Sequence, residues 1–172
     1  MANSMANMVV SDEFEWINRR LALPNPINRE DVECILNFSF IWNLFEGQMC
    51  NTEARINKLE EIVHRLDQKG KLLLDDFKPQ LLYFRNRYVT NGLTNSKFMG
   101  LKFRRNDSEE LVKNVLEGND NELPNVVLAL LVIVFRLRNN MFHGIKALPT
   151  IGGQVGNFKH ANKLLMKLIE ME

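Results

Sequence analysis

Cysteine is scarce in this chain of 172 residues, and its two cysteines, Cys34 and Cys50, stand far apart. A disulfide scaffold or a zinc site needs more thiols or a C-x-x-C spacing, so neither is indicated, and we expect both thiols to be reduced core residues. A net excess of charge is also lacking, because 22 lysines and arginines face 21 acidic residues. The whole molecule therefore cannot attract a polyanion, and a nucleic-acid site has to be a local patch.

Long apolar runs are lacking too. The longest extends from Val126 to Phe135, short of the roughly 18 residues that a membrane-spanning helix needs. Residues 1–10 have neither the basic start nor the apolar centre of a signal peptide, and we expect a loose tail. With 45% hydrophobic residues the chain is nevertheless apolar enough to fold. These features predict a cytoplasmic globular protein of one domain, without a membrane segment.

Helical periodicity dominates what is present. Asn28 is a typical N-cap residue for a long apolar helix that extends to about Met49. Apolar residues at steps of three and four predict a second helix, which Asn51 or Thr52 caps and Gly70 ends. Further helices are predicted over residues 11–23, 79–91, 108–118 and 158–169, with loops over 95–107 and 148–156.

The segment between Pro124 and Gly144 is interpreted as a buried central helix. Its β-branched run alone could be a buried strand, but no turn residue interrupts the segment, and that length favours a helix. The sum is an all-α bundle. Residues 1–27 are expected to be a flexible tail and a short peripheral helix, and residues 28–172 to be the helical domain.

Polar residues follow directly at the C-terminal end of this central helix. The stretch is Arg136-Leu137-Arg138-Asn139-Asn140-Met141-Phe142-His143-Gly144-Ile145-Lys146. Arg138 and His143 fit the pattern R-x4-6-H, and Arg-Asn-Asn-x-Phe-His-Gly resembles the active-site motif of HEPN ribonucleases. Residues 38–46 also resemble the opening helix of several HEPN families. The resemblance implies a single-domain HEPN-like bundle with an extra N-terminal segment, and cleavage of RNA without a metal.

An arginine and a histidine suffice for this chemistry, in which the 2′-hydroxyl of RNA attacks the adjacent phosphorus. An imidazole has an ordinary pKa of about 6.5 and can transfer a proton near neutral pH, so His143 is assigned the acid–base role. Arg138 stays charged and can bind two phosphate oxygens. Asn139 would orient His143 or the phosphate. Neither a metal nor another cofactor is expected.

Other polar residues are candidates for binding the RNA: Asn140 is within the motif, Arg136 and Lys146 flank it, and Glu46 comes from the first long helix. A buried Glu46 would need a partner, which Arg138 or an asparagine could supply. Alternatively, Glu46 lies at the solvent edge. Both interpretations remain open from the sequence.

The remaining histidines and aromatic residues have simpler interpretations. His64 and His160 have no spaced ligand partner, and we expect structural or surface roles for them. Residues 83–88 mix aromatic and basic side chains, as a single-strand-binding surface would. At helical spacing, however, such aromatic residues more often face the core.

The reaction needs two proton transfers, one from the attacking hydroxyl and one to the leaving oxygen, and a single histidine per chain is a limited supply of acid–base groups. HEPN proteins pair so that two motifs line one cleft, and the resemblance therefore implies a homodimer with its site at the two-fold interface. It also implies a toxin or defence component, with an antitoxin or operon-encoded protein as a further partner. The competing hypothesis is a non-catalytic HEPN helical module that binds a nucleotide, RNA or a partner protein. His143 would then be only a favourable cation at a helix end.

Overall fold

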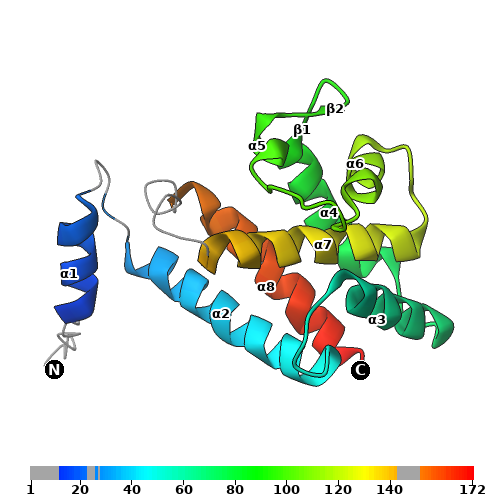
Figure 1. Ribbon diagram of the computed structural model, residues 1–172, viewed down its shortest axis with the longest axis horizontal. Helices are drawn as coiled ribbons and strands as arrows, with labels where there is room; N and C mark the ends of the chain where they lie inside the picture. Colours follow the sequence, from blue (N-terminus) through cyan, green and yellow to red (C-terminus); the bar gives the residue numbers. More distant parts are fainter. Residues whose placement is uncertain (1–11, 23–25, 27, 143–151) are drawn as a thin grey trace, which may run out of the picture.

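Nearly all regular structure is helical in residues 12–22, 26, 28–142 and 152–172, the part of the chain that our computed structural model describes (Figure 1). The predicted all-α bundle is confirmed. Its helices are α1 (Asp12–Leu21), α2 (Arg29–Met49), α3 (Ile56–Gln68), α4 (Leu74–Tyr88), α5 (Ser96–Met99), α6 (Glu109–Glu117), α7 (Leu123–Phe142) and α8 (Val155–Glu170). A 3-10 turn, η2 (Gly152–Gln154), precedes α8, and a short antiparallel hairpin joins β1 (Val89–Thr90) to β2 (Leu93–Thr94).

The centre of the bundle is α7, as the sequence predicts. Residues 129–134 are completely buried all round the helix, because α3, α6, α4 and α8 pack against it. α2 packs along α8, and Figure 1 shows α2 below α7, while α8 crosses behind α7. By length and composition the segment Leu123–Met141 could cross a membrane, but 56% of it is buried inside the protein. Its apolar surface therefore forms the core of the bundle.

The start of α2 is the best-predicted boundary. Asn28 has extended backbone geometry, and its side-chain oxygen accepts a hydrogen bond from the Asp31 N–H at 2.8 Å. This bond satisfies one of the donors that a helix N-terminus leaves unpaired. Phe38, Trp42 and Phe45 then point into the core.

Two predicted helix boundaries are wrong. Asn51 and Thr52 have left-handed backbone geometry, with φ of 52° and 67°, so they form a turn and α3 begins at Ile56. α4 begins at Leu74, which places Pro79 inside the helix instead of in its first turn. Proline already has a helical φ, but inside a helix it lacks one backbone donor and its ring crowds the carbonyl four residues earlier, and the packing of Phe77 and Leu81 in the core outweighs that cost.

The hairpin is a further correction, since the predicted helix over 79–91 ends at Tyr88. Asn91 and Gly92 both have positive φ, 52° and 79°, which is the geometry of a tight hairpin turn that Asn-Gly favours. The first residues of the predicted 95–107 loop form the short helix α5, capped by the Asn95 side chain.

The N-terminal helix and the cysteines agree with expectation. α1 lies within the predicted 11–23 segment, and its Phe14, Trp16 and Ile17 are outside the buried core. The tail predicted over residues 1–10 lies outside the described residues. Cys34 and Cys50 are free and buried, and burial raises the pKa of Cys50 to about 11, so this thiol is unreactive near neutral pH.

Candidate functional site

The last two turns of α7 direct the predicted motif residues to different sides. Successive helical residues are about 100° apart, so Arg136, Arg138, Asn139 and Asn140 cannot share one face. Arg136 and Asn140, four residues apart, lie on one stripe. Arg138 faces α2. These residues therefore fall into two sets that face different sides of α7.

Arg136 is part of the protein interior, which corrects its prediction as an RNA-binding residue. It is 2% exposed, and its Nη1 lies 2.8 Å from Oδ2 of Asp107. Its Nε donates to the Leu101 carbonyl at 3.1 Å, and its Nη2 donates to the Lys102 carbonyl. Burial lowers the pKa of Arg136, and the Asp107 carboxylate opposes that shift. Arg136 thus holds the segment between α5 and α6 against α7.

Asn140 has the same structural task. Its side-chain nitrogen donates to the carbonyls of Leu101 and Gly100, at 2.9 and 3.2 Å. Because these bonds use both N–H groups of the amide, Asn140 in this arrangement is a brace for the same segment. Its role in binding RNA stays a prediction.

Arg138 and Glu46 form the second set, and their pairing answers the question that the sequence left open. Arg138 Nη2 lies 3.7 Å from Glu46 Oε2, and the two side chains are 33% and 19% exposed. Glu46 also accepts hydrogen bonds from the Trp42 indole at 3.0 Å and from the Ala54 backbone at 3.1 Å. The Arg138 guanidinium carbon is 5.8 Å from the centre of the Trp42 ring, a cation–π distance. Glu46 therefore has three partners near the surface.

Asn139 holds Arg138 from the other side. It is 9% exposed, and its side-chain oxygen accepts a hydrogen bond from Arg138 Nη1 at 3.2 Å. The described contact of Asn139 is thus with the arginine of the motif. His143 and Lys146 lie outside the described residues, and Phe142 is the last residue of α7.

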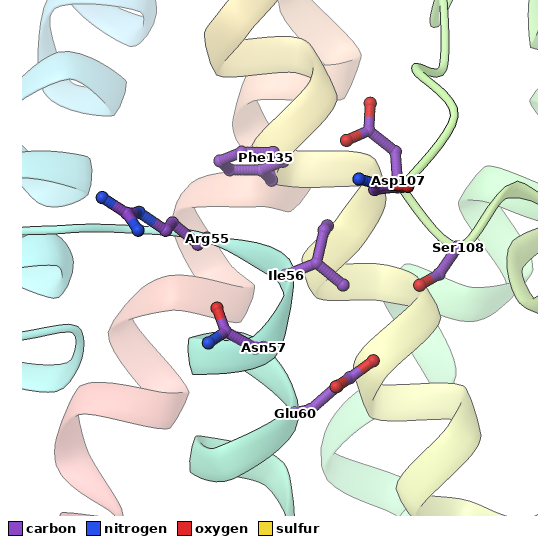
Figure 2. Close-up of a pocket in the computed structure, with 8 residues that line it drawn as sticks. Arg55, Ile56, Asn57, Glu60, Asp107, Ser108 and Phe135 are labelled. Carbon is purple, nitrogen blue, oxygen red and sulfur yellow. The ribbon is translucent and has the colours of Figure 1, made fainter.

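A groove of about 510 Å³ opens beside this cluster, and nothing in the sequence pattern predicts it. Figure 2 shows Phe135 of α7 above Ile56 of α3, with Ser108 entering from the opposite side. Residues 55–57, Glu60, residues 106–108 and Phe135 line it. The Phe135 ring centre is 6.2 Å from that of Trp42, whose ring also makes the cation–π contact with Arg138. Phe135, which lines the groove, and Arg138 therefore both contact the buried Trp42 ring.

The other histidines do not join this cluster. His64 is exposed on α3, and His160 of α8 stacks on Tyr83 of α4, with ring centres 3.9 Å apart. Burial lowers the pKa of His160, and the nearby Lys163 lowers it further. Phe84 and Tyr88 are buried, so most aromatic residues of the 83–88 segment face the core, as their spacing favours.

Neither a search for metal-ligand clusters nor comparisons with known proteins gave a further indication of function. Among the described residues, no three His, Cys, Asp or Glu side chains are placed to hold a metal ion. Comparisons with protein-family models, with curated proteins and with solved structures found no match.

Proposed function

We propose that this protein is a metal-independent endoribonuclease of the HEPN type, a cytoplasmic toxin or defence component that cleaves RNA by attack of the 2′-hydroxyl. The observation that carries the proposal is the position of Arg138. Its guanidinium lies in the last turns of α7, held between Glu46 and Asn139 and 33% exposed, five residues before the histidine of the motif.

The contrast between the two arginines supports a chemical role for Arg138. Arg136 is 3% exposed in its side chain and contacts Asp107 at 2.8 Å, as a structural arginine should. Arg138 lies nearer the surface, and its 3.7 Å contact with Glu46 is loose. The donors from Trp42 and Ala54 stay on Glu46 when Arg138 turns toward a phosphate. Arg138 can therefore bind RNA without leaving a carboxylate unpaired.

A homodimer is part of the proposal, and the outer face of α2 supports it. Leu36, Phe40 and Leu44 recur every four residues and are 52%, 69% and 55% exposed. Residues 34–45 contain no charged side chain, although only one face of this stretch points into the core. The exposed side of this stretch also carries Asn37 and Asn43, so it is uncharged and only partly apolar. Because this face is uncharged, two copies can pack through it without burying an ion.

The nuclease proposal is tested with purified protein and total RNA in EDTA. Wild type is expected to cut RNA, and Arg138→Ala and His143→Ala are expected to lose about 100-fold or more of the rate. His64→Ala and Arg105→Ala, which remove an exposed histidine and an exposed arginine, are the matched controls. Equal RNA decay with all five proteins, at unchanged melting temperatures, would refute the assignment.

The dimer is tested separately by light scattering. Phe40→Glu is expected to give monomers at concentrations where wild type is dimeric, because it places two charges in the apolar face. Leu93→Glu changes an equally exposed apolar residue, 66% exposed, at the distant hairpin and serves as the control. If wild type is itself monomeric, or if Phe40→Glu stays dimeric, the α2 interface is wrong.

A non-catalytic HEPN helical module that binds a nucleotide, RNA or a partner protein is the second candidate. The observation in its favour is that Arg136 and Asn140 brace the 100–102 segment, so part of the motif has a structural purpose. This function predicts RNA retention at low salt without cleavage, and loss of stability rather than activity in motif variants.

A further inference from the structure

We propose that the groove beside Arg138 is a subsite for one unpaired RNA base, with preference for bases that carry an exocyclic amino group. The inference rests on the proposed ribonuclease function and adds a source of sequence preference to it. Four features of the groove carry it: its position, its shape, its charge and its rigidity.

Position comes first. Phe135 lines the groove and is three residues before Arg138, so the two side chains are neighbours on α7, with Cβ atoms about 5–6 Å apart. Trp42 contacts both, with its ring 6.2 Å from the Phe135 ring and 5.8 Å from the Arg138 guanidinium carbon. A nucleotide whose phosphate is bound by Arg138 therefore has its base within reach of the groove.

The shape and lining suit a flat, partly polar ligand. The groove has a volume of about 510 Å³ and is open to solvent. Phe135 and Ile56 form the apolar side in Figure 2, and Asn57, Glu60 and Ser108 bring amide, carboxylate and hydroxyl groups to the rim. Unpaired bases are recognised in this way, by an aromatic contact on the face and hydrogen bonds at the edge.

The charges favour a neutral base over a phosphate. Arg55 and Glu60 oppose each other in sign, and Asp107 is already neutralised by Arg136 at 2.8 Å. Arg55 also pairs with Glu53 at 2.8 Å. Hence the lining offers no net positive charge to an anion. Glu60, which extends from α3 toward α7 in Figure 2, can only accept hydrogen bonds when ionised. Its natural partner is the amino group of cytosine, adenine or guanine.

The wall opposite α3 is rigid. Asp107 accepts a hydrogen bond from the Arg104 backbone at 2.7 Å in addition to its contact with Arg136, and is 6% exposed. A base can therefore enter a preformed groove without ordering the 106–108 segment, which reduces the entropic cost of binding.

The test measures binding of fluorescent single-stranded oligo(dC) and oligo(dT) by anisotropy in EDTA at low salt. These DNA probes lack the 2′-hydroxyl that the proposed cleavage needs, so binding is measured apart from chemistry. Wild type is expected to bind oligo(dC) about tenfold more tightly than oligo(dT), because only cytosine carries the amino group. Glu60→Gln should bring the ratio close to one. Glu110→Gln, an exposed glutamate on α6 outside the groove, should leave it unchanged.

Cleavage mapping on RNA completes the test. If wild type cuts RNA but Glu60→Gln leaves both the oligo(dC) preference and the bases next to the cut sites unchanged, the subsite is overturned and the nuclease stands. If the oligo(dC) preference depends on Glu60 while no RNA is cut, the nuclease is overturned and the base subsite stands. Absence of any oligo(dC) preference in wild type also overturns the subsite.

Discussion

The buried pair between Arg136 and Asp107 gives the sharpest prediction about stability. Asp107→Asn keeps the size of the side chain and removes its charge, which leaves the Arg136 guanidinium buried without its carboxylate. Both side chains are nearly inaccessible, at 3% and 9% exposure, so water cannot replace the lost partner. We expect the variant to fold with clearly reduced stability.

The magnitude follows from the contacts that remain. Removing one member of a buried ion pair typically costs about 3–5 kcal/mol. Arg136 keeps the carbonyls of Leu101 and Lys102, and an asparagine oxygen can still accept from the Arg104 backbone, so we expect a cost somewhat below this range, about 2–3 kcal/mol. For a chain of this size that corresponds to a fall in melting temperature of about 5–10 °C.

Circular dichroism during heating and in urea measures both quantities. Glu53→Gln, which removes a carboxylate from an exposed pair with Arg55, is the control and should change stability by less than about 0.5 kcal/mol. RNA binding by Asp107→Asn is measured at temperatures where the variant is folded. A cost below about 1 kcal/mol together with weakened RNA binding would show that Arg136 serves the RNA instead of the fold.

Three further predictions concern His160 and Gly156 of α8 and Gly47 in the last turn of α2. Burial lowers the pKa of His160, so the unfolded chain takes up this proton more readily; the contribution of His160 to stability is present above about pH 6.5 and is lost as the pH falls through the lowered pKa. The urea midpoint should therefore fall between pH 7.5 and 5.5, and His160→Gln should flatten this slope; equal slopes would contradict the prediction. Gly47→Ala should raise the stability of the monomer by about 0.5–1 kcal/mol, because an added Cβ meets nothing within 4 Å on a helix. Gly156→Ala should lower it by about 1–3 kcal/mol, because the same atom would lie 2.4 Å from the Tyr83 hydroxyl; melting temperatures in the reverse order would contradict this pair.

The sequence predicts those elements whose signals are local. Two local signals each predict a helix independently of the rest of the chain: the cap at Asn28 and the long uninterrupted segment after Pro124. Both helices are present. The Asn91-Gly92 hairpin was also encoded locally, but the helical periodicity before it gave the stronger signal. At Pro79 the local rule fails, because core packing on both sides of a proline outweighs one missing donor.

The sequence names the residues of the candidate site, but it does not show which carboxylate each arginine contacts. Arg136 and Arg138 are two residues apart and therefore about 200° apart around α7, on nearly opposite faces. Periodicity shows that they diverge; it does not show which one meets Asp107 and which one meets Glu46, because both carboxylates come from distant parts of the chain. The structure supplies what periodicity cannot, because the Arg136 side chain is 3% exposed and the Arg138 side chain is 33% exposed. This difference in burial supports the proposal that Arg136 stabilises the fold and that Arg138 binds RNA.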